Sequence, residues 1–110
     1  MEKNFNVLEG DFFYQNFSEG KQKLMLVDVR TYRCAPGTIN AHLALYDEFG
    51  REPQYRCLGE PLAFLKGETG DPNEFVHIWV YENAGDREQK RATLWSDPEW
   101  LFYTKKSAER

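Results

Sequence analysis

The residues best suited to catalysis or ligand binding are a histidine and two polar side chains in segments predicted to be strands. His77 is one of only two histidines in the chain. Arg30 and Tyr32 lie two residues apart in an earlier segment, so they share one face of a strand. A histidine among aromatic residues acts as a general acid or base, an arginine holds an anionic group, and a tyrosine donates a hydrogen bond. These residues therefore predict either acid–base chemistry on a small aromatic or keto compound, or a buried polar layer, with Asp28, that satisfies its own hydrogen bonds.

Two further arginines and their neighbours add candidates for ligand binding. Arg87 and Arg91 are four residues apart and share one face of a predicted helix. They either grip a carboxylate or phosphate, or form structural ion pairs with acidic side chains such as Glu68. Trp79 shares a strand face with His77. The catalytic candidate is therefore His77, and the candidates for ligand binding are Arg30, Tyr32, Glu68, Trp79, Arg87 and Arg91.

The sequence contains no metal-ligand set and no cofactor fingerprint. His42 and His77 fall on different predicted elements, and no cysteine or carboxylate spacing completes a set of ligands. A phosphate-binding glycine loop, a nucleophile elbow and a dinucleotide fingerprint are also missing. Cys34 and Cys57 lack a CxxC pattern and are predicted to be reduced thiols without a function. We therefore expect neither a metal nor a cofactor.

The candidate residues lie on two predicted strands, Leu24–Arg33 and Phe75–Glu82, whose faces differ in character. One face is expected to form a dry aliphatic core beneath helices: Met25, Val27, Val29, Thr31, Val76, Ile78 and Val80. The other face is expected to lie against another polypeptide or to line a pocket: Leu26, Asp28, Arg30, Tyr32, Phe75, His77, Trp79 and Tyr81. If the strands are neighbours, Asp28, Arg30, Tyr32 and His77 converge on one surface.

The segment between these strands is predicted to hold a helix and a short strand. A helix from Ile39 to about Gly50 is predicted by an apolar stripe with spacings of four, three and three, formed by Ile39, Leu43, Tyr46 and Phe49. His42 lies beside this stripe and is expected to be a partly exposed surface group. Residues 51–61 are expected to be an irregular helix end or a short turn. Leu62–Glu68 is strand-like and turns back through Thr69–Asn73.

Two more helices are predicted after the Phe75–Glu82 strand. Asp86 is a suitable N-cap for a helix from Arg87 to near Ser96. A last helix is predicted from Pro98 to about Ala108, and either Ser96 or Asp97 can cap it.

The predicted order of strand, helix, strand, strand and helix is that of a ferredoxin-like α+β sandwich with an antiparallel sheet. Such a fold closes with a further strand, which does not follow the last predicted helix here. The N-terminal extension, residues 1–23, is either a disordered leader or supplies the edge strand through Asp11–Phe17, beside Leu24–Arg33. The domain itself is expected to span residues 24–110.

Composition excludes several classes of partner. A net charge of −4 and a pI near 5.2 argue against nucleic acid and anionic membranes. No run of 18 apolar residues is present, so membrane insertion is not expected. The amino-terminal residues carry no targeting pattern, and a cytoplasmic protein is the resulting expectation. The aromatic content of 15% is high for 110 residues and points to an interface.

Several motifs resemble the NIPSNAP family over about residues 25–104. They are the RTY of Arg30–Tyr32 with Pro36–Gly37, the ALYDE of Ala44–Glu48, the HIWVY of His77–Tyr81, the pair Arg87 and Arg91, and the DPEW of Asp97–Trp100. The resemblance implies a dimeric α+β barrel, in which two ferredoxin-like subunits place their sheets face to face. It implies no defined activity.

Two functional hypotheses follow. The first is a homodimer of NIPSNAP type that binds a small molecule or a partner without established catalysis. The second is a cofactor-independent monooxygenase-like or isomerase-like enzyme that uses His77 with Arg30 and Tyr32. A cavity of a few hundred Å³ that reaches His77 would favour the second, and a filled interior the first.

Overall fold

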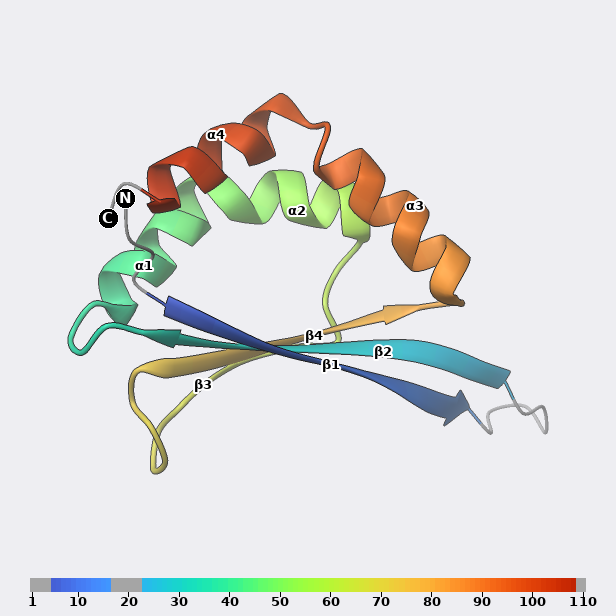
Figure 1. Cartoon of the computed structure of the whole chain (residues 1–110), viewed down its shortest axis with the longest axis horizontal. Helices are drawn as coiled ribbons and strands as arrows, with labels where there is room; N and C mark the ends of the chain where they lie inside the picture. The colour runs from blue at the N-terminus through green and yellow to red at the C-terminus, as the bar shows by residue number, and fades with distance from the viewer. Residues whose placement is uncertain (1–4, 17–22, 109–110) are drawn as a thin grey trace.

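The chain folds into a four-stranded antiparallel sheet with the described helices on one of its faces (Figure 1). The computed structural model describes residues 5–16 and 23–108, with side chains from residue 24 onward. Its elements are β1 (Phe5–Asn16), β2 (Lys23–Cys34), α1 (Ile39–Leu45), η2 (Tyr46–Gly50), α2 (Arg51–Leu58), β3 (Ala63–Lys66), β4 (Glu74–Tyr81), α3 (Ala84–Leu94) and α4 (Pro98–Ala108).

The strand order β1-β2-β4-β3 confirms the ferredoxin-like sheet and shows how its edge is formed. β2 and β4 are central neighbours, with Arg30 opposite His77. β1 pairs with β2 from Phe5 to Asn16, so the N-terminal segment supplies an edge strand that begins earlier than the predicted Asp11–Phe17. Phe17, the last residue of the predicted strand, lies outside the described residues.

The helices cover the aromatic face of the sheet, so the predicted assignment of the two faces was wrong. Phe75, His77, Trp79 and Tyr81 are all buried, whereas Val76, Ile78 and Val80 are only half-buried. The main core cluster joins the aromatic face of the sheet to the helices: Leu26, Tyr46, Leu58, Trp79, Tyr81, Leu94, Trp100 and Tyr103. The aliphatic side chains therefore lie on the face of the sheet that no described helix covers.

The composition of the helices explains this orientation. Their inward side chains include the large rings of Tyr46, Trp100 and Tyr103. Tyr46 meets Tyr103 edge to face with ring centroids 5.8 Å apart, and Tyr55 meets Trp79 in the same manner at 6.1 Å. Large rings from both layers meet between helix and sheet and gain from ring contacts. The smaller aliphatic side chains of the sheet would leave more of that space empty.

The first helical layer is longer than predicted. α1, η2 and α2 follow one another without a break, so residues 51–58 are helical rather than irregular. η2 is a π-helical turn just before Pro53. A widened turn accommodates the proline, which lacks an N–H and would clash with a carbonyl in a regular helix. α2 ends at Gly59, whose φ of 87° favours glycine.

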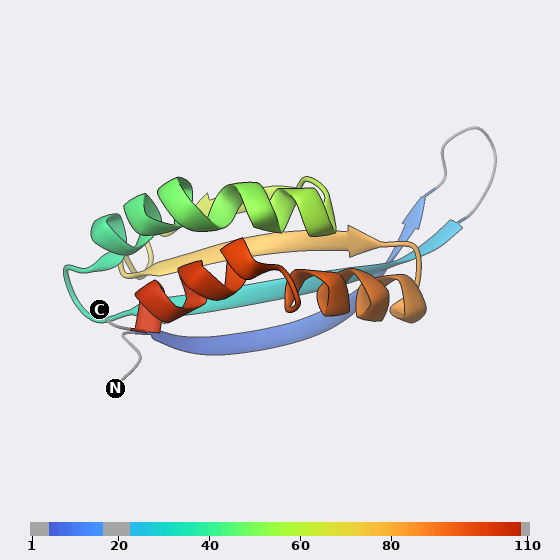
Figure 2. The same cartoon turned by 90° about the horizontal axis from the view of Figure 1, so that it is seen from above.

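Side-chain caps set the positions of the last two helices. Asn83, not Asp86, caps α3, and its Oδ1 accepts a hydrogen bond from the Asp86 N–H at 2.8 Å. Asp97 Oδ1 accepts from the backbone N–H of Glu99 at 2.9 Å, which resolves the cap of α4 in favour of Asp97 rather than Ser96. Arg56 of α2 holds the same aspartate at 2.6 Å. α4 is thereby fixed beside α2, and two rows of helices cross the sheet side by side (Figure 2).

Candidate functional site

A cavity of about 380 Å³ lies between the sheet and the helices. Its sheet side is formed by β2, β3 and β4, and its roof by α1, η2, α2, α4 and the end of α3. The lining residues are mostly aromatic, with a few polar groups among them: Arg30, Tyr32, His42, Tyr46, Gln54, Phe64, Phe75, His77, Trp95, Trp100, Tyr103, Thr104, Ser107 and Ala108. The cavity has the size and composition of a small-molecule site.

The sheet side brings together residues that strand alternation predicted to converge. The Arg30 Nε donates a hydrogen bond to the Tyr32 hydroxyl at 3.1 Å. The Tyr32 ring stacks on His77 with centroids 5.0 Å apart and an interplanar angle of 19°. The Arg30 guanidinium also lies 3.8 Å from the carboxylate of Asp28. The predicted polar group is therefore present, but it lies beneath the helices rather than on an open face of the sheet.

His77 is held as a neutral imidazole with a defined tautomer. Trp79 donates its indole N–H to His77 Nδ1 at 2.6 Å. Nδ1 therefore carries no proton, and the neutral ring carries it on Nε2. Burial, together with the positive charges of Arg30 and Arg91, lowers the pKa of His77 from 6.5 to about 3. At neutral pH the ring donates from Nε2, and this N–H makes no hydrogen bond within the described part of the chain.

The helix side adds phenols, an amide and an indole. Tyr46 donates a hydrogen bond from its hydroxyl to Gln54 Oε1 in the interior. Burial raises the pKa of Tyr46 and of Tyr103 above the ordinary tyrosine value, so both remain neutral phenols. The indole N–H of Trp100 is buried and has no hydrogen-bond acceptor among the described residues. A buried donor without a partner is costly, and the Trp100 side chain that carries it also lines the cavity.

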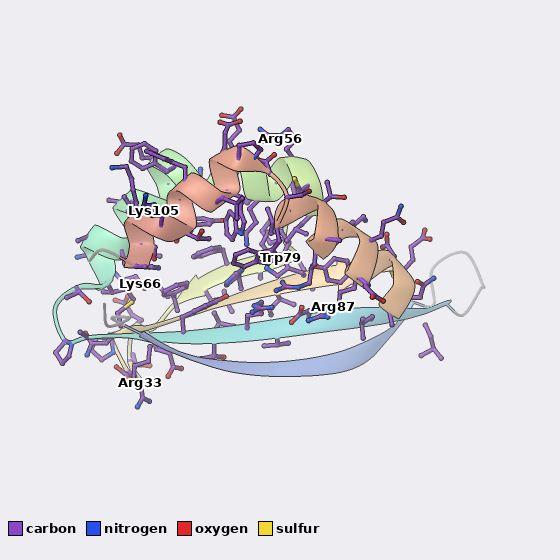
Figure 3. All side chains as sticks on the ribbon, turned by 45° about the horizontal axis from the view of Figure 1, so that its top comes forward. Arg33, Arg56, Lys66, Trp79, Arg87 and Lys105 are labelled. Atoms are coloured by element: carbon purple, nitrogen blue, oxygen red, sulfur yellow. The ribbon has the colours of Figure 1, made fainter. Side chains whose placement is uncertain are left out.

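A buried ion pair next to the cavity explains the position of Arg87. Asp28 is 0% exposed, and its carboxylate accepts from Arg87 Nε of α3 at 2.9 Å. This pair joins α3 to the sheet. Arg87 therefore forms a structural ion pair, and its partner is Asp28 and not Glu68. Arg91 is half-buried and makes no ion pair among the described residues. Trp79 lies between sheet and helices and Arg87 lies close to the sheet (Figure 3).

The structure separates the predicted site residues into three groups. Arg30, Tyr32 and His77 line the cavity. Trp79 supports it from behind by its hydrogen bond to His77. The remaining three do not line it: Glu68 is exposed in the turn before β4, and Arg87 and Arg91 lie on α3.

Several cavity residues were missed in the sequence. His42 was expected to be partly exposed, but it is 5% exposed and lies 5.5 Å from Phe75, ring to ring. Gln54 falls in a segment that was expected to be irregular, so no periodicity indicated that its side chain points inward. Trp100 both packs in the core and lines the cavity. A signal existed only for Trp100, in the helical spacing of Trp100, Tyr103 and Ser107.

Fold and site together define a ferredoxin-like α+β domain with an aromatic cavity under its helices. None of the described helices is long and apolar enough to cross a membrane. In the described part of the chain no three His, Cys, Asp or Glu residues are grouped to hold a metal ion.

The sequence matches the NIPSNAP family over residues 27–110, and the chain belongs to this family. Its structure is similar to a NIPSNAP family protein of unknown function from Agrobacterium tumefaciens, with 40% identity, a TM-score of 0.68, and 72% of this chain and 71% of the other covered. It also resembles an uncharacterized NIPSNAP-like domain protein from Burkholderia xenovorans, with 30% identity, a TM-score of 0.72, and coverage of 77% and 73%. Among curated proteins no significant match was found.

Proposed function

We propose that this NIPSNAP protein is a cytoplasmic homodimer that binds a small molecule in the cavity beneath its helices. The cavity of about 380 Å³ carries the proposal, because it lies next to a tightly packed core and is lined by aromatic rings and a few polar groups. Cys34 and Cys57 are both free thiols, which is compatible with a reducing compartment.

His77 serves ligand binding in this proposal rather than catalysis. A general base needs a pKa near the working pH, whereas burial and nearby arginines lower the pKa of His77 to about 3. Its Nδ1 is also occupied by the Trp79 N–H. The cavity reaches His77, as the enzyme hypothesis required, but the state of the ring favours a fixed hydrogen-bond donor. We therefore do not propose the monooxygenase-like or isomerase-like alternative.

Ligand binding is tested by blocking the cavity. Ser107 is buried and lines the cavity from α4, so Ser107→Phe places a ring inside it. Ser96→Phe is the matched control, because Ser96 is exposed and does not line the cavity. Saturation-transfer NMR with a panel of aromatic and aliphatic compounds is expected to show binding to the wild type and the control, and none to Ser107→Phe. Absence of any binding that depends on the cavity would refute the proposal.

The homodimer is proposed to form through the uncovered face of the sheet. This face carries Met25, Val27, Val29, Thr31, Ala63, Leu65, Val76, Ile78 and Val80. Leu65 is 52% exposed and the other side chains are mostly half-buried. An uncovered apolar face of this kind favours a partner, and a second copy presents the same flat surface. A standard interface of about 800 Å² per subunit would contribute roughly 20 kcal/mol before association costs. The proposed interface is thus the aliphatic face, not the aromatic one.

Sedimentation tests this interface with two substitutions at one position. The wild type is expected to sediment at twice the chain mass of 13.0 kDa. Ile78→Lys places a charge in the middle of the uncovered face and is expected to give monomers, whereas Ile78→Leu keeps volume and polarity and is expected to remain dimeric. A monomeric wild type, or a dimer that survives Ile78→Lys, would refute this arrangement.

A further inference from the structure

The aromatic lining of the cavity favours a flat, aromatic ligand. On the sheet side, Tyr32 stacks on Phe75 with centroids 4.9 Å apart and planes 12° apart, and Phe64 lies parallel to Phe75 within 5°. On the roof, the Trp100 and Tyr103 rings lie 5.1 Å apart. Aromatic rings thus form both sides of the cavity, and rings gain most from stacked or edge-to-face contacts with another ring.

The polar groups of the cavity include two donors that need acceptors. The Trp100 N–H is buried, and no described residue accepts its hydrogen bond. The Nε2–H of His77, defined by the bond from Trp79 to Nδ1, makes none within the described part of the chain either. An indole N–H cannot accept, and a neutral imidazole with its Nδ1 occupied can only donate. A ligand that satisfies these groups must therefore carry acceptor atoms on its polar edge.

Charge decides between an anionic and a cationic ligand, since aromatic cages also bind cations. Arg30 is the one arginine or lysine among the described lining residues, and these include no aspartate or glutamate. Arg30 contacts Tyr32 and Asp28 and contributes positive potential to the cavity. Burial, followed by the positive charges of Arg30 and Arg91, lowers the pKa of His77. Burial and positive potential likewise disfavour a cationic ligand in this region.

We propose that the cavity takes a planar aromatic compound whose polar edge carries acceptor oxygens and no positive charge, and an aromatic carboxylate is its simplest member. The ring lies against the sheet-side rings around Phe75, and an oxygen accepts from the Trp100 N–H or from the His77 Nε2–H. This inference rests on the proposed ligand-binding function of the same cavity, and it adds the chemical class.

Three matched probes test the class on the wild-type protein. 2-Naphthoate is planar and anionic, 2-naphthylmethylammonium is planar and cationic, and decalin-2-carboxylate is anionic but saturated. Titration calorimetry is expected to show 2-naphthoate binding at least about tenfold tighter than either of the others, because each of these lacks one of the two matched features. Equal or tighter binding of the cation or the saturated acid would overturn the proposed class while leaving the ligand-binding function in place. No binding by any probe would count against both.

One substitution then tests the indole donor. Trp100→Phe keeps a ring but removes the N–H, and it is expected to weaken the binding of 2-naphthoate about tenfold. Trp95→Phe is the matched control, because Trp95 also lines the cavity but is 48% exposed, and a change below about twofold is expected. Equal losses in the two variants, or none in Trp100→Phe, would overturn the role of this donor.

Discussion

Protonation of His77 makes a measurable contribution to the pH dependence of stability. The folded protein lowers the pKa of this residue from 6.5 to about 3, mainly by burial. Between these values the unfolded chain binds a proton that the folded chain does not, so stability falls as the pH is lowered from 7. pH 5 lies about 1.5 units below the pKa of the histidine in the unfolded chain, which corresponds to about 2 kcal/mol of lost stability. This amount changes little if the folded pKa lies anywhere below about 4.

The His77→Phe variant isolates this contribution. Urea unfolding of both proteins at pH 7 and pH 5, at one fixed protein concentration, gives a difference in which the effect of the carboxylates cancels. The free energy of unfolding of the wild type is expected to fall between pH 7 and pH 5 by about 2 kcal/mol more than that of the variant. His42→Phe, treated identically, reports the contribution of the other histidine.

Equal pH dependence in wild type and His77→Phe would contradict the burial of His77 as a neutral ring. It would mean that His77 takes up a proton in the folded state near its ordinary pKa, and is therefore neither desolvated nor fixed by Trp79. Nitrogen chemical shifts of the imidazole give a direct check at neutral pH, since Nδ1 is expected to be unprotonated and Nε2 protonated.

Three further outcomes are expected in urea unfolding. Arg87→Met leaves a buried carboxylate without its closest cation and is expected to cost about 3 kcal/mol, whereas Arg91→Met, which breaks no ion pair among the described residues, is expected to cost below about 1 kcal/mol; equal costs would contradict the buried pair. Gly50→Ala places a Cβ 2.9 Å from a tyrosine ring carbon and is expected to cost about 1–3 kcal/mol, while Gly70→Ala meets nothing within 4 Å and is expected to be nearly neutral; a neutral Gly50→Ala would contradict the close packing. Deletion of residues 2–22 removes β1 from the edge of β2 and is expected to cost at least about 3 kcal/mol through lost hydrogen bonds; unchanged unfolding would show β1 to be dispensable.

Local patterns in the sequence predicted β2, β3 and β4 and the face that the polar residues share. Alternation in β2 and β4 placed Arg30, Tyr32 and His77 on one face, because a strand directs alternate side chains to opposite sides whatever it packs against. Turn and cap residues predicted the start of α4 at Pro98, since capping depends on a few neighbouring residues, although the choice of Asp97 over Ser96 came from the structure. The family motifs are spread along the chain and were likewise readable without coordinates. These features are short-range, and they carried the family and the fold class.

The tertiary structure alone decided which face of the sheet the helices cover and where the cavity lies. Both faces of the sheet are apolar enough to be buried, so composition could not rank the aliphatic face of Ile78 against the aromatic face of Phe75. The choice depends on the rings that the helices bring, Tyr46 and Trp100 among them, and on the pairing of Asp28 with a helix arginine. The inward rotation of His42 and Gln54 is set by the same packing. Local sequence fixes periodicity, whereas the direction in which each periodic face points is set by contacts between residues far apart in the chain.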